Sequence, residues 1–172
     1  MSPRIADTVA IGLLAGLSCL FTAYAVSVPI WVLFIAWASF FAAGGGLHGA
    51  LRSLTMSVIG IASATVTLLA ATALGGSPLV VAGCVVVGAG VLVLIRNGNL
   101  LSFTPAGFFG FACTVGTLEA TDLAINSSVS LTHPVVLVLG ATVCGIGFGL
   151  GSQKLGSLLA GSTATASANP AT

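Results

Sequence analysis

The sequence predicts an all-α membrane protein with six transmembrane helices, arranged as two inverted three-helix repeats with short or broken middle helices. Three observations lead to this fold class. Of the 172 residues, 57% are hydrophobic and only 4% are charged, a composition that would leave a soluble fold with almost no polar surface. Apolar runs close to the roughly 20 residues that a membrane helix needs fill nearly the whole chain. The few basic residues recur at alternate breaks between these runs.

The apolar runs place the expected spans at residues 6–24, 29–43, 51–74, 79–95, 100–118 and 134–152. Turn-forming or charged residues separate them, at 27–29, 44–46, 75–78, 96–99 and 119–133. The first run precedes several others, so it is expected to be a retained helix rather than a cleaved signal. Residues 1–155 are therefore predicted to form a single transmembrane domain. Residues 156–172, rich in Ser, Ala, Thr and Gly, are predicted to form a flexible cytoplasmic tail.

The charged residues predict the orientation of the chain, because Lys and Arg near span ends collect on the cytoplasmic side. With six spans and a cytoplasmic N-terminus, all four bases fall on that side: Arg4, Arg52, Arg96 and Lys154. The outer loops then hold Glu119 and Asp122. We therefore expect a multi-pass protein of the bacterial inner (cytoplasmic) membrane with both termini in the cytoplasm.

An internal repeat is predicted between halves at about residues 6–74 and 79–152. Aligning 6–74 with 80–148 pairs the aromatic segments 34–39 and 108–113, and an odd number of spans per half inverts the second half. Each middle span follows a Ser or Thr and a proline, a helix-start signal. In the second half this predicts partial unwinding over 99–104, which membranes tolerate only against protein or a water-lined cavity. The alternative is that these prolines start or kink ordinary helices.

Aromatic walls with sparse hydroxyl groups suit a narrow path for small polar molecules. The predicted constriction consists of Trp37, Phe40, Phe108 and Phe111. The predicted hydrogen-bonding groups are Ser39, Thr104 and Thr114. Individually, these aromatic residues could equally be core or lipid-facing bulk. GxxxG patterns in the other spans, such as Gly12 with Gly16, indicate close helix packing and a homo-oligomer.

Ionisable residues are too few and too scattered for catalysis, metal binding or a nucleic-acid surface, so no enzyme activity and no cofactor is expected. No Asp, Glu, Lys or Arg is expected in the interior of a span. This favours a passive channel or facilitator for a small neutral polar solute such as urea or a short amide. A small anion such as formate or nitrite, attracted by helix N-termini, is an alternative. So are an ion-coupled carrier that titrates Glu119 or Asp122, and a non-transporting membrane scaffold or assembly protein.

The segments 31–45 and 103–112 contain the strings Trp-Ala-Ser-Phe-Phe-Ala-Ala-Gly-Gly and Phe-Thr-Pro-Ala-Gly-Phe-Phe-Gly-Phe-Ala. They resemble a small bacterial inner-membrane family called domain of unknown function 1097. The resemblance covers most of the chain apart from the tail, and it implies a membrane location without any assigned functional residue. A looser similarity, in proline-headed aromatic spans, is to bacterial urea channels and transporters, although this chain lacks an in-span Glu.

Overall fold

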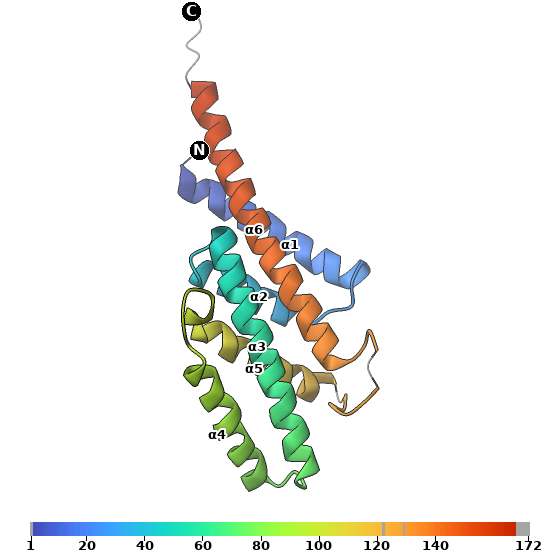
Figure 1. Ribbon diagram of the computed structural model, residues 1–172. Helices are drawn as coiled ribbons and strands as arrows, with labels where there is room; N and C mark the ends of the chain where they lie inside the picture. Colours follow the sequence, from blue (N-terminus) through green and yellow to red (C-terminus); the bar gives the residue numbers. More distant parts are fainter. Residues whose placement is uncertain (1, 122, 129, 168–172) are drawn as a thin grey trace, which may run out of the picture.

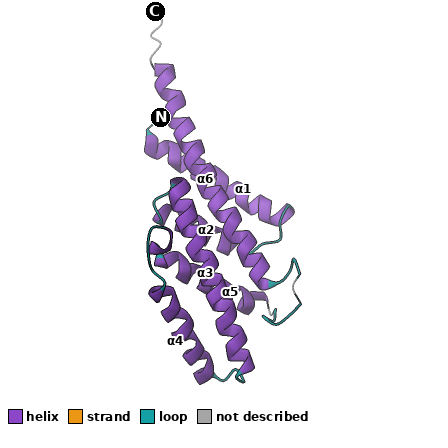
Figure 2. Ribbon diagram, in the orientation of Figure 1, coloured by secondary structure: helices purple, strands orange, loops and turns teal. Residues whose placement is uncertain are grey.

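The computed structural model describes residues 2–121, 123–128 and 130–167, and this part of the chain is helical without any strand (Figures 1 and 2). In chain order its helices are α1 (Pro3–Tyr24), α2 (Ile30–Ala42), α3 (Gly46–Ala73), α4 (Pro78–Leu94), the short 3-10 helix η1 (Leu100–Ser102), α5 (Thr104–Thr121) and α6 (Pro134–Ser167). The prediction of an all-helical fold is confirmed: the described residues form six α-helices, and each overlaps an expected span.

Proline and glycine determine where several helices begin. Pro78 occupies the first turn of α4, where a missing N–H costs nothing, and the Ser77 hydroxyl accepts a hydrogen bond from the backbone N–H of Val80 at 3.5 Å. The turn between α2 and α3 contains three successive glycines, at positions 44 to 46, with φ of 103°, 67° and 60°. Other residues rarely adopt these angles. This turn sends α3 back antiparallel to α2.

Two helix boundaries differ from the expected ones. Helix α3 begins at Gly46 instead of residue 51, so Arg52 lies in its second turn. Helix α6 continues to Ser167, so residues 156–167, expected to be a flexible tail, are helical. Leucines and alanines favour helix there, and the first proline comes only at position 170. Residues 168–172 of the expected tail lie outside the described residues.

The break before α5 agrees with the predicted unwinding of residues 99–104. The single turn η1 is followed by Phe103, whose φ of −95° and ψ of 68° are not helical. Regular α-helix begins only at Thr104. Irregular backbone therefore precedes α5, and Pro105 lies in the first turn of this helix. Of the two middle helices expected to be short or broken, α2 is short with 13 residues, whereas α5 has 18 residues and follows a break.

One end of the bundle gathers segments that are distant in the chain (Figure 1). Asp7, near the start of α1, lies against Gly156 of α6. The backbone N–H of Gly46 donates a hydrogen bond to Gln153 Oε1 at 2.8 Å, and Arg52 reaches Ser102 in the loop between α4 and α5. The residues at this end include all four bases, Arg4, Arg52, Arg96 and Lys154.

The opposite end holds the other loops. Val28, between α1 and α2, lies close to Gly140 of α6, and Trp31 at the start of α2 lies close to Gly116 near the end of α5. The turn between α3 and α4 is also at this end (Figure 1). The helices thus run back and forth between two ends.

In the part of the chain that the structure describes, three helices are long and apolar enough to cross a membrane: α1 with 22 residues, α3 with 28 and the Pro134–Gly161 part of α6 with 28. Two shorter apolar helices are α2 with 13 residues and α4 with 17. At 1.5 Å per residue, α2 spans about 20 Å, less than the roughly 30 Å of a bilayer core. These lengths indicate membrane association.

The helix packing has two centres, α3 and α6. Helix α3 packs against α5 and α4, and α6 packs against α2 and α1. Helices α2, α3, α5 and α6 meet in a core of buried apolar side chains: Val32, Ile61, Cys113, Val138 and Ala141. The middle of the molecule is therefore closed by side chains.

Candidate functional site

Trp37 is a buried ring held between α2 and α6. Its side chain is 3% exposed, and its Nε1–H donates a hydrogen bond to Ser152 Oγ at 3.2 Å. The indole stacks on Phe34, with centroids 6.0 Å apart and an interplanar angle of 5°, and lies 5.7 Å from the Phe148 ring. The indole N–H, the one polar group of this ring, is thus hydrogen-bonded to a serine of α6.

Ser39 and Phe40 lie deeper in the same region. The Ser39 hydroxyl is 2.7 Å from the Ser53 hydroxyl of α3, and both residues are fully buried. Phe40 is also fully buried, packs over Gly149 and belongs to a cluster with Ala36, Ala50 and Ile146. These two residues connect α2 to α3 and to α6, respectively.

The four predicted site residues on α5 lie in different environments. Thr114 is fully buried and donates to the Gly110 carbonyl at 2.9 Å. The Thr104 hydroxyl is buried without a hydrogen-bond partner among the described residues. Phe111 is half-buried and lies near Gly88 of α4, whereas Phe108 is 42% exposed on the outer surface.

The structure therefore brings Trp37, Ser39 and Phe40 together around α2 and directs them to α3 and α6. The hydrogen bonds and ring contacts described for these residues do not reach the four on α5. Helices α2 and α5 do touch, and apolar Val32 and Cys113 from them fill the core between the two groups.

Arg52 is a feature that the sequence analysis used only for orientation. Its Nη2 donates to Ser102 Oγ at 2.9 Å and its Nη1 to the Ala43 carbonyl at 3.4 Å. Its guanidinium carbon lies 5.9 Å from the centroid of the Phe103 ring, and its Nε is buried without a partner among the described residues. The sequence has no proline between Gly46 and Arg52, so the helix can begin at Gly46. This places Arg52 inside α3 rather than at its start.

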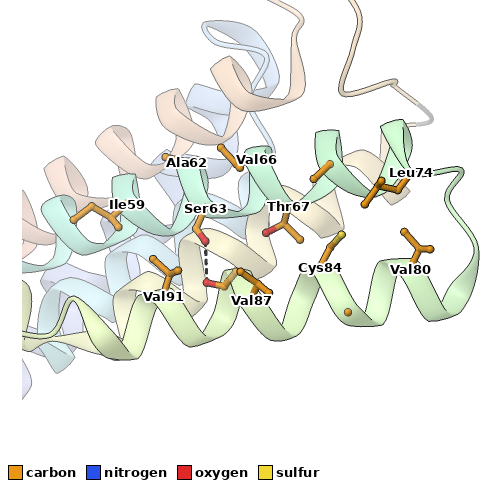
Figure 3. Close-up of a pocket in the computed structure, with 13 residues that line it drawn as sticks. Ile59, Ala62, Ser63, Val66, Thr67, Leu74, Val80, Cys84, Val87 and Val91 are labelled. Carbon is orange, nitrogen blue, oxygen red and sulfur yellow. Dashed lines mark hydrogen bonds between the residues drawn. The ribbon is translucent and has the colours of Figure 1, made fainter.

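The described residues line surface grooves, of which two are considered. The larger, of about 650 Å³, runs between α3 and α4 and is almost entirely apolar (Figure 3). Its polar residues are Thr67 and Ser63, and the Ser63 hydroxyl donates to the Gly88 carbonyl at 2.9 Å. A groove of about 240 Å³ lies between α1 and α2, with Trp37 on its wall. Trp37 is the only predicted site residue that lines either groove.

No three His, Cys, Asp or Glu side chains among the described residues come together in a way that could hold a metal ion. The four cysteines are free, and only Cys113 is buried. His133 is 7% exposed, and its ring bonds locally, with Nε2 3.3 Å from the Ile125 carbonyl and Nδ1 accepting from the Val135 N–H. The polar interior of the described chain is thus mainly hydroxyl groups.

The helical fold and its long apolar helices indicate a helical membrane protein. Within that class, the chain belongs to the family described as protein of unknown function (DUF1097), whose profile matches residues 8–157. The match runs from α1 into the second half of α6, and it confirms the family resemblance predicted from the sequence. No curated protein and no solved structure matches the chain.

Proposed function

We propose that this protein is a facilitator for the passage of a small neutral polar solute, such as urea or a short amide, across the bacterial inner membrane. The observation that carries the proposal is the chemistry of the buried polar side chains. Among the described residues they are all Ser, Thr or His, with no Asp, Glu, Lys or Arg. Hydroxyl groups can exchange hydrogen bonds with an uncharged solute, whereas a charged one would need a counter-charge in the membrane.

The proposed architecture is six spans in two inverted halves. Helices α1, α2 and α3 correspond in turn to α4, α5 and α6. The helix contacts follow this correspondence, because α3 packs on α4 and α5, and α6 packs on α1 and α2. Two residue contacts correspond in part. The Leu33 carbonyl lies against Gly145 and the Gly107 carbonyl against Gly60. Leu33 pairs with Gly107 in the alignment of 6–74 with 80–148, whereas Gly145 pairs there with Ala71 and not with Gly60.

The proposed path passes between α2 and α5. The apolar core there would act as a hydrophobic gate that opens by small helix movements. Trp37 and Phe40, which pack toward α6, and Phe111, which packs toward α4, would flank the gate on its two sides. The hydroxyls proposed to bond the solute are those of Ser39, Thr104 and Thr114. Exposed Phe108 would face lipid or a second subunit. Gly12 and Gly16 leave open space on α1, which supports the proposed homo-oligomer, because small residues let helices approach closely.

The proposed orientation predicts which loops face the cytoplasm. In a chain whose native cysteines are replaced by alanine, Asn97→Cys and Asn126→Cys place one exposed thiol in the α4–α5 and α5–α6 loops. We expect a membrane-impermeant maleimide to label position 126 in intact spheroplasts and position 97 only after permeabilisation. Labelling of position 97 in intact cells would contradict the orientation, and labelling of both positions would contradict the six-span topology.

Solute flux tests the function directly. Stopped-flow light scattering on proteoliposomes would compare urea, acetamide, glycerol and formate with empty liposomes. We expect fast urea or acetamide entry, changed about fivefold or more by Trp37→Ala, because losing one buried hydrogen bond shifts a barrier by about 1 kcal/mol. The matched control is Trp31→Ala, which removes a half-exposed tryptophan from the start of the same helix. An unchanged urea rate in the Trp37 variant would remove this residue from the path.

A non-transporting assembly protein is the second candidate. The filled core and the backbone contacts at Gly60 and Gly145 favour it, since such packing is suited to a rigid scaffold. Folded protein that admits none of the four solutes into liposomes would favour this candidate over the facilitator.

A further inference from the structure

The basic end of the bundle contains a partly buried cation without an anionic partner. Arg52 lies in the second turn of α3, and the partners described for its guanidinium are neutral: the Ser102 hydroxyl and the Ala43 carbonyl. No carboxylate of the described residues forms an ion pair with it. A charge in such surroundings interacts with an opposite charge far more strongly than it would in water.

The guanidinium has unused hydrogen-bond donors on a defined edge. Arg52 carries five N–H groups in a planar fork that fits two oxygens of a planar acceptor. Its Nε–H has no partner among the described residues, and the adjacent Nη2 bears two hydrogens for the one described acceptor, Ser102 Oγ. The Nε–H is therefore a donor without a described acceptor, and a two-oxygen acceptor on this edge would share Nη2 with Ser102 Oγ.

The surroundings of Arg52 supply the other parts of a small-ligand site. The Phe103 ring covers the guanidinium plane at 5.9 Å. Thr104, the next residue, has a buried hydroxyl without a described partner and begins α5, whose N-terminal end is positive. The Nε atom itself is buried, so a ligand can reach it only if its surroundings move. Ser102, which contacts the guanidinium, belongs to the single turn η1.

We propose that Arg52, Phe103 and Thr104 form a binding site for the planar oxygen-bearing group of a small solute, and that it holds small oxyanions such as formate or nitrite more tightly than neutral amides such as urea. The inference rests on the proposed transport path and goes beyond the neutral solute proposed for it, because it predicts that small oxyanions compete with that solute for a site at one mouth of the path. Charge-assisted hydrogen bonds are about twice as strong as neutral ones, which sets the order of affinity.

Equilibrium binding tests the site independently of transport. The full-length protein, purified in detergent, would be titrated with 13C-formate and 13C-urea, and binding would be followed by NMR line broadening at constant ionic strength. We expect saturable formate binding, with Arg52→Gln weakening it about tenfold or more, equivalent to about 1.4 kcal/mol. The matched control is Arg96→Gln, which removes the same charge from an exposed position at the same end and should bind formate like the native protein.

Two further variants keep the test decisive if Arg52→Gln does not fold. Arg52→Lys retains the charge without the planar fork and should weaken formate binding severalfold, and Thr104→Val removes the hydroxyl at constant shape and should weaken it about threefold. Three outcomes would overturn the proposal. The Arg52 variants could bind formate as tightly as the native protein, Arg96→Gln could weaken formate binding as much as Arg52→Gln does, or urea could bind as tightly as formate. Formate binding without flux of any solute would leave the site standing and overturn the facilitator. Urea flux without Arg52-dependent formate binding would overturn the site and leave the facilitator standing.

Discussion

Replacing Gly60 by alanine will destabilise the protein, whereas the same replacement at Gly147 will leave its stability unchanged or raised. A Cβ at Gly60 would coincide with the backbone carbonyl of Gly107 on α5, while a Cβ at Gly147 meets nothing within 4 Å. Because the obstacle is backbone, only separation of α3 from α5 can relieve it. Overpacking of this kind costs about 1–3 kcal/mol and sometimes more, against a gain in helix propensity of about 1 kcal/mol common to both variants.

Thermal unfolding of the detergent-solubilised protein, followed by fluorescence-detected size exclusion, would measure this difference. In a chain of this length each kcal/mol moves the midpoint by about 2–4 °C, so Gly60→Ala should melt several degrees below the native protein. Gly147→Ala should melt at or above the native temperature. If the two variants unfold together, the close approach of α3 and α5 is wrong.

Phe40→Ala will be strongly destabilising, and a second replacement, Gly149→Leu, will partly restore its stability. The Phe40 ring is fully buried on α2, and a Cβ at Gly149 of α6 would lie 2.5 Å from its Cδ1 atom. Truncating a buried phenylalanine costs about 3–5 kcal/mol because it leaves a cavity. Gly149→Leu alone should also destabilise, since it overfills the same space. Together the two changes exchange volume across the α2–α6 interface.

A double-mutant cycle in the same unfolding assay measures this coupling. We expect the two effects to be non-additive by about 1–3 kcal/mol, the range found for residues in contact. The control is Phe41→Ala, which truncates the neighbouring ring at 40% exposure and should cost much less. If Phe40→Ala instead melts like the native protein while the urea rate changes, Phe40 lines the path and is not part of the core.

Much of the fold could be predicted because, in lipid, helix positions follow from apolar length and turn chemistry. Pro78 and the glycines of the α2–α3 turn locate helix ends directly. The Thr104–Pro105 dipeptide likewise predicts the irregular backbone before α5. The predicted start of α3 at residue 51 was wrong because Gly46 is both the last glycine of the turn and the first residue of the helix. Its first N–H is satisfied by Gln153, a partner that no local pattern reveals.

The candidate site was less predictable because both faces of a membrane helix are apolar. In soluble helices polarity distinguishes the buried face from the exposed one, but Phe40 is fully buried while Phe41 next to it is 40% exposed. Composition does not separate them. The tight contacts at glycines, such as Gly149 under Phe40, decide which face packs inward. The role of Arg52 also depends on such contacts, because its partners Ser102 and Phe103 are about 50 residues distant in the chain.

The hydrogen bond between Gly46 and Gln153 can form only late in synthesis. These residues are separated by 107 positions, so the turn that starts α3 leaves the ribosome long before its partner on α6 exists. The packing of the earlier helices is therefore completed only after α6 has been synthesised. A chain that stops short of Gln153 should consequently reach the membrane but leave its earlier turn open to quality-control proteases.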